Sequence, residues 1–152
     1  MVTTKEVKEL RDKTGISIGE CKRALEESGG DMKKALEILQ GLGAAVSLKK
    51  AGRTLASGVV RAYIHSTNDI GAMVELLCET DFVARNEEFQ ALAYDLAMQL
   101  AALPIKTKDA FLAQTSIKDS SRSVKDLLET AIHKFGEKIE LGGYSRFSIS
   151  GR

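Results

Sequence analysis

The chain has 152 residues, which is enough for one good core or for a small module attached to a medium-sized domain, and too few for more than two domains. Apolar residues make up 43% and charged residues 28%, with 22 Lys and Arg against 21 Asp and Glu, a balance typical of a globular protein. A surface that follows nucleic-acid phosphates would need a more basic composition, so we expect no direct nucleic-acid contact.

The two cysteines, Cys21 and Cys78, are too few for a disulfide framework, and neither lies in a CxxC motif or a Cys/His cluster with metal-ligand spacing. This usage predicts a reducing, cytoplasmic location and no metal or other cofactor. No apolar run approaches the roughly 20 residues of a membrane span, and the charged start VTTKEVKEL is unlike a signal peptide. We therefore expect neither membrane contact nor export.

Residues 1–42 are predicted to form a compact module of three short helices. Two pairs have the spacing of a capping box, and Asp31 can cap a third helix; the pairs are Thr3 with Glu6 and Ser17 with Glu20. Glycines are expected to end the helices, at Gly15, Gly29, Gly30 and Gly41. The small and basic segment 43–57 is predicted to be a partly helical linker.

Residues 58–152 are predicted to form an α+β core domain. Apolar and polar residues alternate over 59–65 and again over 72–78, with the turn residues Thr67, Asn68 and Asp69 between them, which predicts a β-hairpin. A long amphipathic helix with Asn86 as its N-cap should run to Leu103 and cover the hairpin.

The remainder of the core domain is predicted to be an irregular connection, a helix and a closing strand. The connection covers 105–121 with at most a helical turn at 110–113, and the helix covers 123–135. The closing strand has its apolar residues at odd positions, namely Ile139, Leu141, Phe147 and Ile149. The expected fold class is α+β, with a small antiparallel sheet covered by helices on one face.

Candidate catalytic groups are weak, so an enzyme is not expected. Cys78 is in register with apolar strand residues, which is typical of a buried side chain. Neither His65 nor His133 has an acidic neighbour at ligand spacing in the sequence, and Glu75 with Glu79 is better explained as a solvated strand face. No phosphate-binding glycine motif is present.

The stretch CETDFVARNEEF places Phe82 between a strand and a helix, where small polar residues are usual. Pattern allows two explanations for this residue. Phe82 either folds back on the sheet or staples the following helix, or else it stands exposed as an anchor for a protein partner. Periodicity alone does not choose between them.

Five stretches resemble bacterial elongation factor Ts, in the order of that family. They are VKELRDKTGISIGECKRALEESGGDMKKALEIL, KKAGR, GVVRAYIH, VELLCETDFVARNEEFQALAYDLAMQLA and FGEKIELGGYSRF. The resemblance implies a non-enzymatic factor that binds the GTPase elongation factor Tu and promotes release of its GDP. It also implies that residues 1–42 are a module like a ubiquitin-associated domain that docks on the GTPase.

The family's partner contacts can be transferred to matching positions in this chain. Asp81 and Phe82 correspond to the pair that enters the partner near its Mg²⁺ and nucleotide phosphates, and Thr80 and Val83 would shape that tip. The remaining implied contacts are Lys8, Arg11 and Ile18 in the helical module and Gln99 in the long helix, where Gln99 replaces a histidine common in the family.

The chain also departs from the family in two places. The region 104–121 is compressed, so contacts made by a longer segment there would be lost. Short relatives imply a homodimer through the C-terminal strand, and Ser145 stands where some carry a cross-linking cysteine. An alternative function of another class is a helical adaptor that binds a protein partner without affecting nucleotide exchange.

Overall fold

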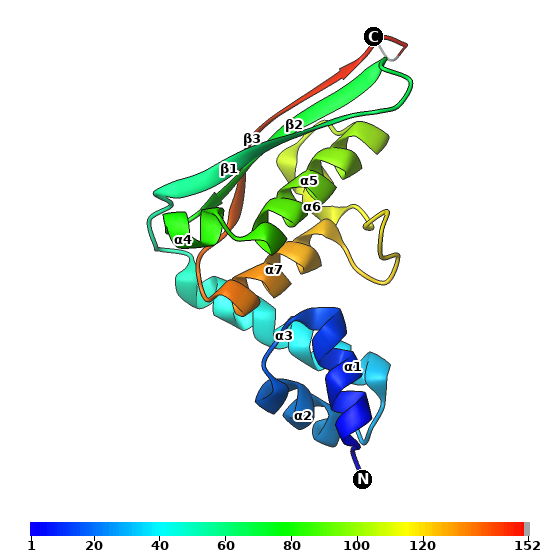
Figure 1. Cartoon of the computed structure of the whole chain (residues 1–152), viewed down its shortest axis with the longest axis vertical. Coiled ribbons are helices and arrows are strands. Elements are labelled where there is room, and N and C mark those ends of the chain that lie inside the picture. The colour runs from blue at the N-terminus through cyan, green and yellow to red at the C-terminus, as the bar shows by residue number, and fades with distance from the viewer. Residues whose placement is uncertain (151–152) are drawn as a thin grey trace. The chain divides into compact units, whose positions relative to one another are not determined.

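The computed structural model describes residues 1–150, which divide into two compact units. The first unit comprises Met1–Gly52 together with Glu129–Gly136, and the second comprises Arg53–Leu128 together with the residues from Glu137 onward. Figure 1 shows the elements of both units along the chain. Mixed helix and sheet confirms the α+β class predicted from the sequence.

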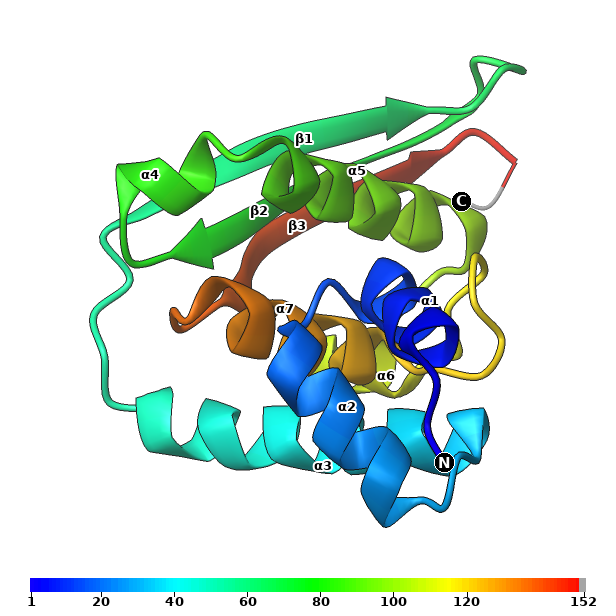
Figure 2. The ribbon, with the colours of Figure 1, turned by 60° about the horizontal axis from the view of Figure 1, so that its bottom comes forward.

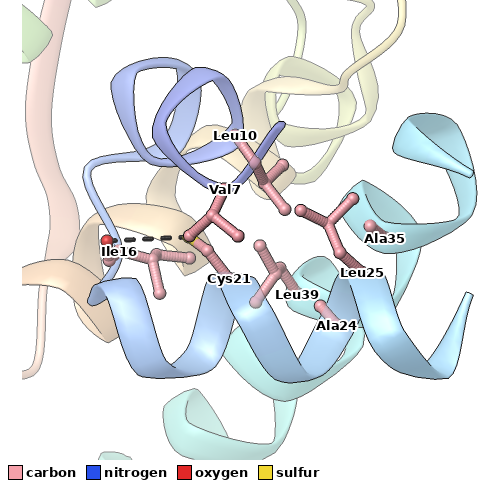
Figure 3. Close-up of a cluster of buried hydrophobic side chains, with 8 residues drawn as sticks. All are labelled: Val7, Leu10, Ile16, Cys21, Ala24, Leu25, Ala35 and Leu39. Atoms are coloured by element: carbon pink, nitrogen blue, oxygen red, sulfur yellow. Dashed lines mark hydrogen bonds between the residues drawn. The ribbon is translucent and has the colours of Figure 1, made fainter. Parts of the chain in front are cut away.

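The first unit is built on three helices, α1 (Thr4–Thr14), α2 (Ile18–Glu27) and α3 (Met32–Lys50). Their apolar faces meet in one buried cluster, shown in Figure 3, which consists of Val7, Leu10, Ile16, Cys21, Ala24, Leu25, Ala35 and Leu39. The caps explain where these helices begin, because Thr3 and Glu6 form a full capping box and Asp31 accepts from the backbone N–H groups of Lys33 and Lys34.

Helix α3 does not end at Gly41 as predicted but continues to Lys50. A glycine inside a helix costs only about 1 kcal/mol, which packing can offset. Packing is close here, since a Cβ at Gly43 would lie 3.1 Å from the backbone oxygen of Glu129. The expected boundary between residues 42 and 43 therefore falls inside α3, and residues 43–50 of the expected linker are helical.

The second unit contains an antiparallel sheet in the order β1–β2–β3, formed by β1 (Ser57–Ile64), β2 (Ile70–Cys78) and β3 (Glu140–Ser148). Helix α5 (Glu87–Ala102) lies along one face of this sheet, as Figure 2 shows. Three further helices are α4 (Asp81–Ala84), α6 (Lys108–Ala113) and α7 (Val124–Phe135), of which α7 continues into the first unit.

The hairpin of β1 and β2 turns at the predicted residues. Asn68 adopts a left-handed conformation with φ of 60°, which asparagine tolerates better than most residues, and the N–H of His65 donates to the oxygen of Ile70 at 2.9 Å. Ala72, Val74 and Leu76 are buried beneath α5 together with Phe89 and Leu96. The long helix and its Asn86 cap are confirmed, because the Asn86 side chain accepts from the N–H groups of Glu88 and Phe89.

Strand β3 contains an irregularity that the alternating pattern did not predict. Val74 pairs with Tyr144 but Leu76 pairs with Leu141, so β3 has one extra residue at Gly142 and Gly143. A bulge of this kind reverses which residues face the core. Leu141 is therefore buried, whereas Phe147, which has the same parity, is 70% exposed on the opposite face.

Candidate functional site

The junction between β2 and α4 forms a short tip that exposes Phe82. Thr80 caps α4 by accepting from the N–H of Val83 at 3.3 Å, and Val83 and Ala84 are buried on the inner side of this single turn. Phe82 points the other way and is 86% exposed. Of the two explanations that the sequence pattern left open, the structure therefore favours the exposed side chain.

Acidic side chains form hydrogen bonds and an ion pair at the base of the turn that carries Phe82. The hydroxyl of Ser57 donates to the carboxylate of Asp81 at 2.7 Å, which ties the tip to the start of β1. Arg53 lies 3.4 Å from the carboxylate of Glu79, and Glu137 contacts Thr80. The tip thus presents one large apolar group beside an oriented carboxylate.

Cys78 lies directly below the tip and is fully buried. Its thiol donates to the backbone oxygen of Thr80 at 3.3 Å. Burial, reinforced by the nearby negative charge of Glu137, raises the pKa of the Cys78 thiol. Because the thiolate is the reactive form, this cysteine is suited to packing and not to nucleophilic chemistry.

Gln99, expected from the resemblance to contact the partner, is only 3% exposed. Its Nε2 donates to the side-chain oxygen of Gln114 and to the backbone oxygen of Thr115, both at 3.1 Å. Its Oε1 accepts from the N–H of Ile117 at 2.8 Å. In this structure Gln99 fastens the segment 114–117 to α5 and is not presented to a partner.

Lys8, Arg11 and Ile18 are exposed and belong to the first unit. Lys8 and Arg11 are three residues apart on α1, so they share one face of that helix. Ile18 is 59% exposed at the first position of α2, where its side chain has no place in the cluster of Figure 3. A pair of cations and a lone exposed aliphatic side chain are the kinds of group that a protein partner can contact.

His133 has an acidic partner that local spacing did not reveal. Its Nε2 lies 2.8 Å from Glu20 of the same unit, across the contact between α2 and the end of α7. Burial would raise the pKa of the Glu20 carboxyl, but hydrogen bonds from His133 and Ser17 outweigh it and lower the pKa. This pair has the character of a packing contact between helices.

Glu137 contacts the tip from outside it, and sequence reasoning missed this residue. Its carboxylate accepts hydrogen bonds from residues more than fifty positions earlier in the chain. No spacing rule connects a residue after α7 with the end of β2, so local pattern carries no signal for it. Only the pairing of β3 with β2 brings the two junctions together.

Other kinds of site are not evident in the part of the chain that the structure describes. Residues 1–150 contain no group of three or more His, Cys, Asp or Glu side chains arranged to hold a metal ion. None of the described helices is both long and apolar enough to span a membrane.

The fold and the site define a two-unit α+β protein that displays an aromatic side chain on a braced turn between a strand and a helix. Residues 79–152 match the family model described as elongation factor TS. Elongation factor Ts of Leptospira biflexa is 37% identical over 99% of this chain and 98% of its own length, and that of Thermotoga petrophila is 40% identical over 94% of each chain.

The chain belongs to the elongation factor Ts family, which confirms the resemblance seen in the sequence and supports a role in translation elongation. The alignment to the Leptospira protein spans 195 residues, more than this chain contains, so that relative carries additional residues. Elongation factor Ts of Clostridium perfringens is 42% identical over 98% of this chain but over only 48% of its own length.

Proposed function

We propose that this protein binds elongation factor Tu in its GDP-bound form and promotes GDP release in the cytoplasm, without catalysing a chemical reaction. The observation that carries the proposal is the exposure of Phe82 on a turn that is held by hydrogen bonds from Ser57 to the Asp81 side chain and from the Thr80 backbone to Glu137. Its own chain buries the neighbouring Val83 but leaves Phe82 without a pocket. A large apolar side chain held in this way is suited to filling a pocket on another protein.

The chemistry of the tip fits a competitor for bound nucleotide. GTPases hold the nucleotide phosphates with a backbone loop and with Mg²⁺ in near-octahedral geometry. Insertion of the Phe82 ring would favour a displaced arrangement of that site, and the Asp81 carboxylate would repel the phosphates. Reciprocity requires that nucleotide expels the factor by the same ratio as the factor expels nucleotide.

One phenylalanine is not sufficient for this coupling. Shifting a two-state equilibrium by about 10⁴ requires about 5.5 kcal/mol, whereas burying one phenylalanine contributes about 1.5–3 kcal/mol. Further contacts must distinguish the two states of the partner. We assign them to Thr80 at the tip, whose shape the buried Val83 supports from inside, and to Lys8, Arg11 and Ile18 of the first unit, which would act as a docking module like a ubiquitin-associated domain.

The test is release of fluorescent GDP from elongation factor Tu, followed by stopped flow with micromolar factor. We expect release to accelerate and the rate to saturate as the factor concentration rises. An adaptor without exchange activity would bind the GTPase, measured by calorimetry, and leave the release rate unchanged. That second outcome would remove the proposed function and favour the adaptor.

We further propose that the chain forms a non-covalent homodimer through the sheet that contains the C-terminal strand. The sheet face opposite α5 exposes several large apolar side chains, namely Val60, Ile64, Met73 and Phe147. Ala62, Met73 and Phe147 also line a groove of about 250 Å³ on this face. A contiguous exposed apolar surface of this kind is typical of an interface, and β3 is an edge strand of the sheet.

Sedimentation velocity tests the homodimer. The wild-type chain should sediment as a dimer at micromolar concentration, and Phe147→Lys should shift it toward the monomer. Lys5→Glu, on the exposed surface of α1, provides a control that should leave the distribution unchanged. A wild-type monomer at all concentrations would contradict the homodimer but not the exchange function.

A further inference from the structure

Two glutamates form a reciprocal contact below the Phe82 tip. Oε1 of Glu137 accepts from the backbone N–H groups of Glu79 and Thr80, each at 3.0 Å. Oε2 of Glu79 in turn accepts from the backbone N–H of Lys138 at 2.7 Å. Each carboxylate therefore binds the backbone next to the other, and we call this arrangement of Glu79 and Glu137 the carboxylate clasp.

The clasp also fixes the cap of α4. The hydroxyl of Thr80 donates to Oε2 of Glu137 at 2.6 Å, and the same oxygen of Thr80 accepts from the N–H of Val83 at 3.3 Å. A hydroxyl has one proton, so its donation to Glu137 leaves a lone pair directed at Val83. Glu137 thereby sets the rotamer of Thr80 that begins the turn carrying Phe82.

A turn as short as α4 requires such external support. Four residues are far fewer than a helix needs to be stable in water. Phe82 itself contributes little, because an 86% exposed ring has few contacts with its own chain. Its direction therefore comes from the backbone of residues 79–83, which is held by the burial of Val83 and by hydrogen bonds to Glu137. Those hydrogen bonds have a carboxylate acceptor and are stronger than neutral ones.

We propose that Glu137 is a positioning residue for nucleotide exchange, which holds the Asp81–Phe82 tip in its exposed orientation before the partner is met. This inference rests on the proposed exchange function and extends it to a residue outside the tip. A contact group that is already ordered loses less conformational freedom on binding, so order at the tip favours association. Glu79, with Arg53 at 3.4 Å, supports the same junction from the other side.

The test uses Glu137→Ala and Glu137→Gln, with Glu140→Ala as a matched control. Glu140 is a nearby exposed carboxylate that contacts Lys138 and has no bond to the tip. We expect Glu137→Ala to slow stimulated GDP release about tenfold, because it removes three hydrogen bonds to one carboxylate. Glu137→Gln keeps one oxygen acceptor and should recover part of the rate, and Glu140→Ala should match the wild type.

A double-mutant cycle distinguishes positioning from a general loss of stability. If Glu137 acts through Phe82, Glu137→Ala should cause little further loss of release rate in a Phe82→Ala background, since effects of coupled residues are not additive. Equal losses in both backgrounds would overturn the proposal. Should Glu137→Ala fail to fold, Glu137→Gln provides the same cycle.

Amide resonances give a readout that needs no partner. In the wild type the N–H groups of Glu79 and Thr80 should show the downfield shift and slow hydrogen exchange of amides bound to a carboxylate, and Glu137→Ala should remove both. If Glu137→Ala leaves the chemical shifts and hydrogen-exchange rates of these two amides unchanged, the inference is overturned, even if the variant releases GDP more slowly. If the wild type fails to release GDP while these amides respond as expected, the proposed function fails and the ordering of the tip by Glu137 stands.

Discussion

Helices α4 and α5 are consecutive in the chain, and each contains a phenylalanine, but one of these side chains is exposed and the other is buried. Each begins at a polar cap, Thr80 or Asn86, and each carries a phenylalanine in its first turn. Phe89 of α5 is fully buried against the sheet, whereas Phe82 of α4 is almost fully exposed. Seven buried residues hold α5 in place, whereas α4 is held by two buried residues and by the hydrogen bonds of Glu137 at its start, so the α4 phenylalanine is left available for another molecule.

The largest expected effect on stability comes from substitution of the buried Phe89. Phe89→Ala should reduce the free energy of unfolding by about 3–5 kcal/mol, because the lost transfer energy of a core phenylalanine is accompanied by an unfilled cavity. Urea denaturation followed by circular dichroism measures this change. A loss below about 0.5 kcal/mol, the usual range of exposed sites, would show that the two phenylalanines do not differ as the structure indicates.

Substitution of the exposed Phe82 should affect GDP release and leave stability nearly unchanged. Phe82→Ala should slow stimulated GDP release by about one to two decades, the equivalent of burying one phenylalanine in the partner. The free energy of unfolding should stay within about 0.5 kcal/mol of the wild type, as is usual for surface substitutions. Stopped flow and urea denaturation on the same preparation give both numbers, and a variant that unfolds would identify Phe82 as a core residue.

Sequence pattern was sufficient where the determining interactions are local. The caps at Thr3, Asp31 and Asn86 and the apolar face of α5 depend on residues within a few positions of each other. Pattern predicted the wrong end for α3, because helix propensity counts a glycine as a break and cannot register the close approach of Glu129 to Gly43. Local rules therefore failed where a distant segment supplied the packing.

The candidate site was less predictable than the fold for the same reason. Whether Phe82 is buried depends on whether any other part of the chain offers it a pocket, and periodicity does not contain that information. Family resemblance, which carries the outcome of such long-range contacts, indicated the exposed alternative. Neither source indicated Glu137, nor the bulge at Gly142 and Gly143 that turns Phe147 outward.

Near the C-terminal end of α5, the buried polar residue Gln99 also serves the fold through its contacts. Gln99→Met keeps a similar volume but leaves the N–H of Ile117 and the oxygen of Thr115 without their partner. We expect a loss of about 1–3 kcal/mol in the free energy of unfolding, the usual result of an unsatisfied buried polar group. Gln90→Met is a matched control on the same helix, because Gln90 makes one bond to Ala84 at a half-buried position.

Thermal unfolding of the two glutamine variants measures the difference. If Gln99 instead acts in a partner contact, its variant would keep the stability of the wild type and lose exchange activity. If Gln99→Met lowers stability clearly more than Gln90→Met, the three hydrogen bonds of Gln99 stabilise the fold.

The smallest expected effect on the free energy of unfolding comes from the N-cap residues of α5 and α4. Asn86 caps its helix by local hydrogen bonds alone, whereas Thr80 also binds the distant Glu137. Asn86→Ala removes the acceptor for two N–H groups of α5 and should cost about 1 kcal/mol of unfolding free energy, which Asn86→Asp should restore. Thr80→Ala removes the cap of α4 and also the hydroxyl that binds Glu137. Because α4 has two buried residues whereas α5 has seven, Thr80→Ala should change stability less than Asn86→Ala while slowing GDP release more. The opposite result would be that Thr80→Ala lowers stability more than Asn86→Ala and slows GDP release less. It would mean that α4 belongs to the structural core as α5 does, and that its exposed phenylalanine is not held for a partner.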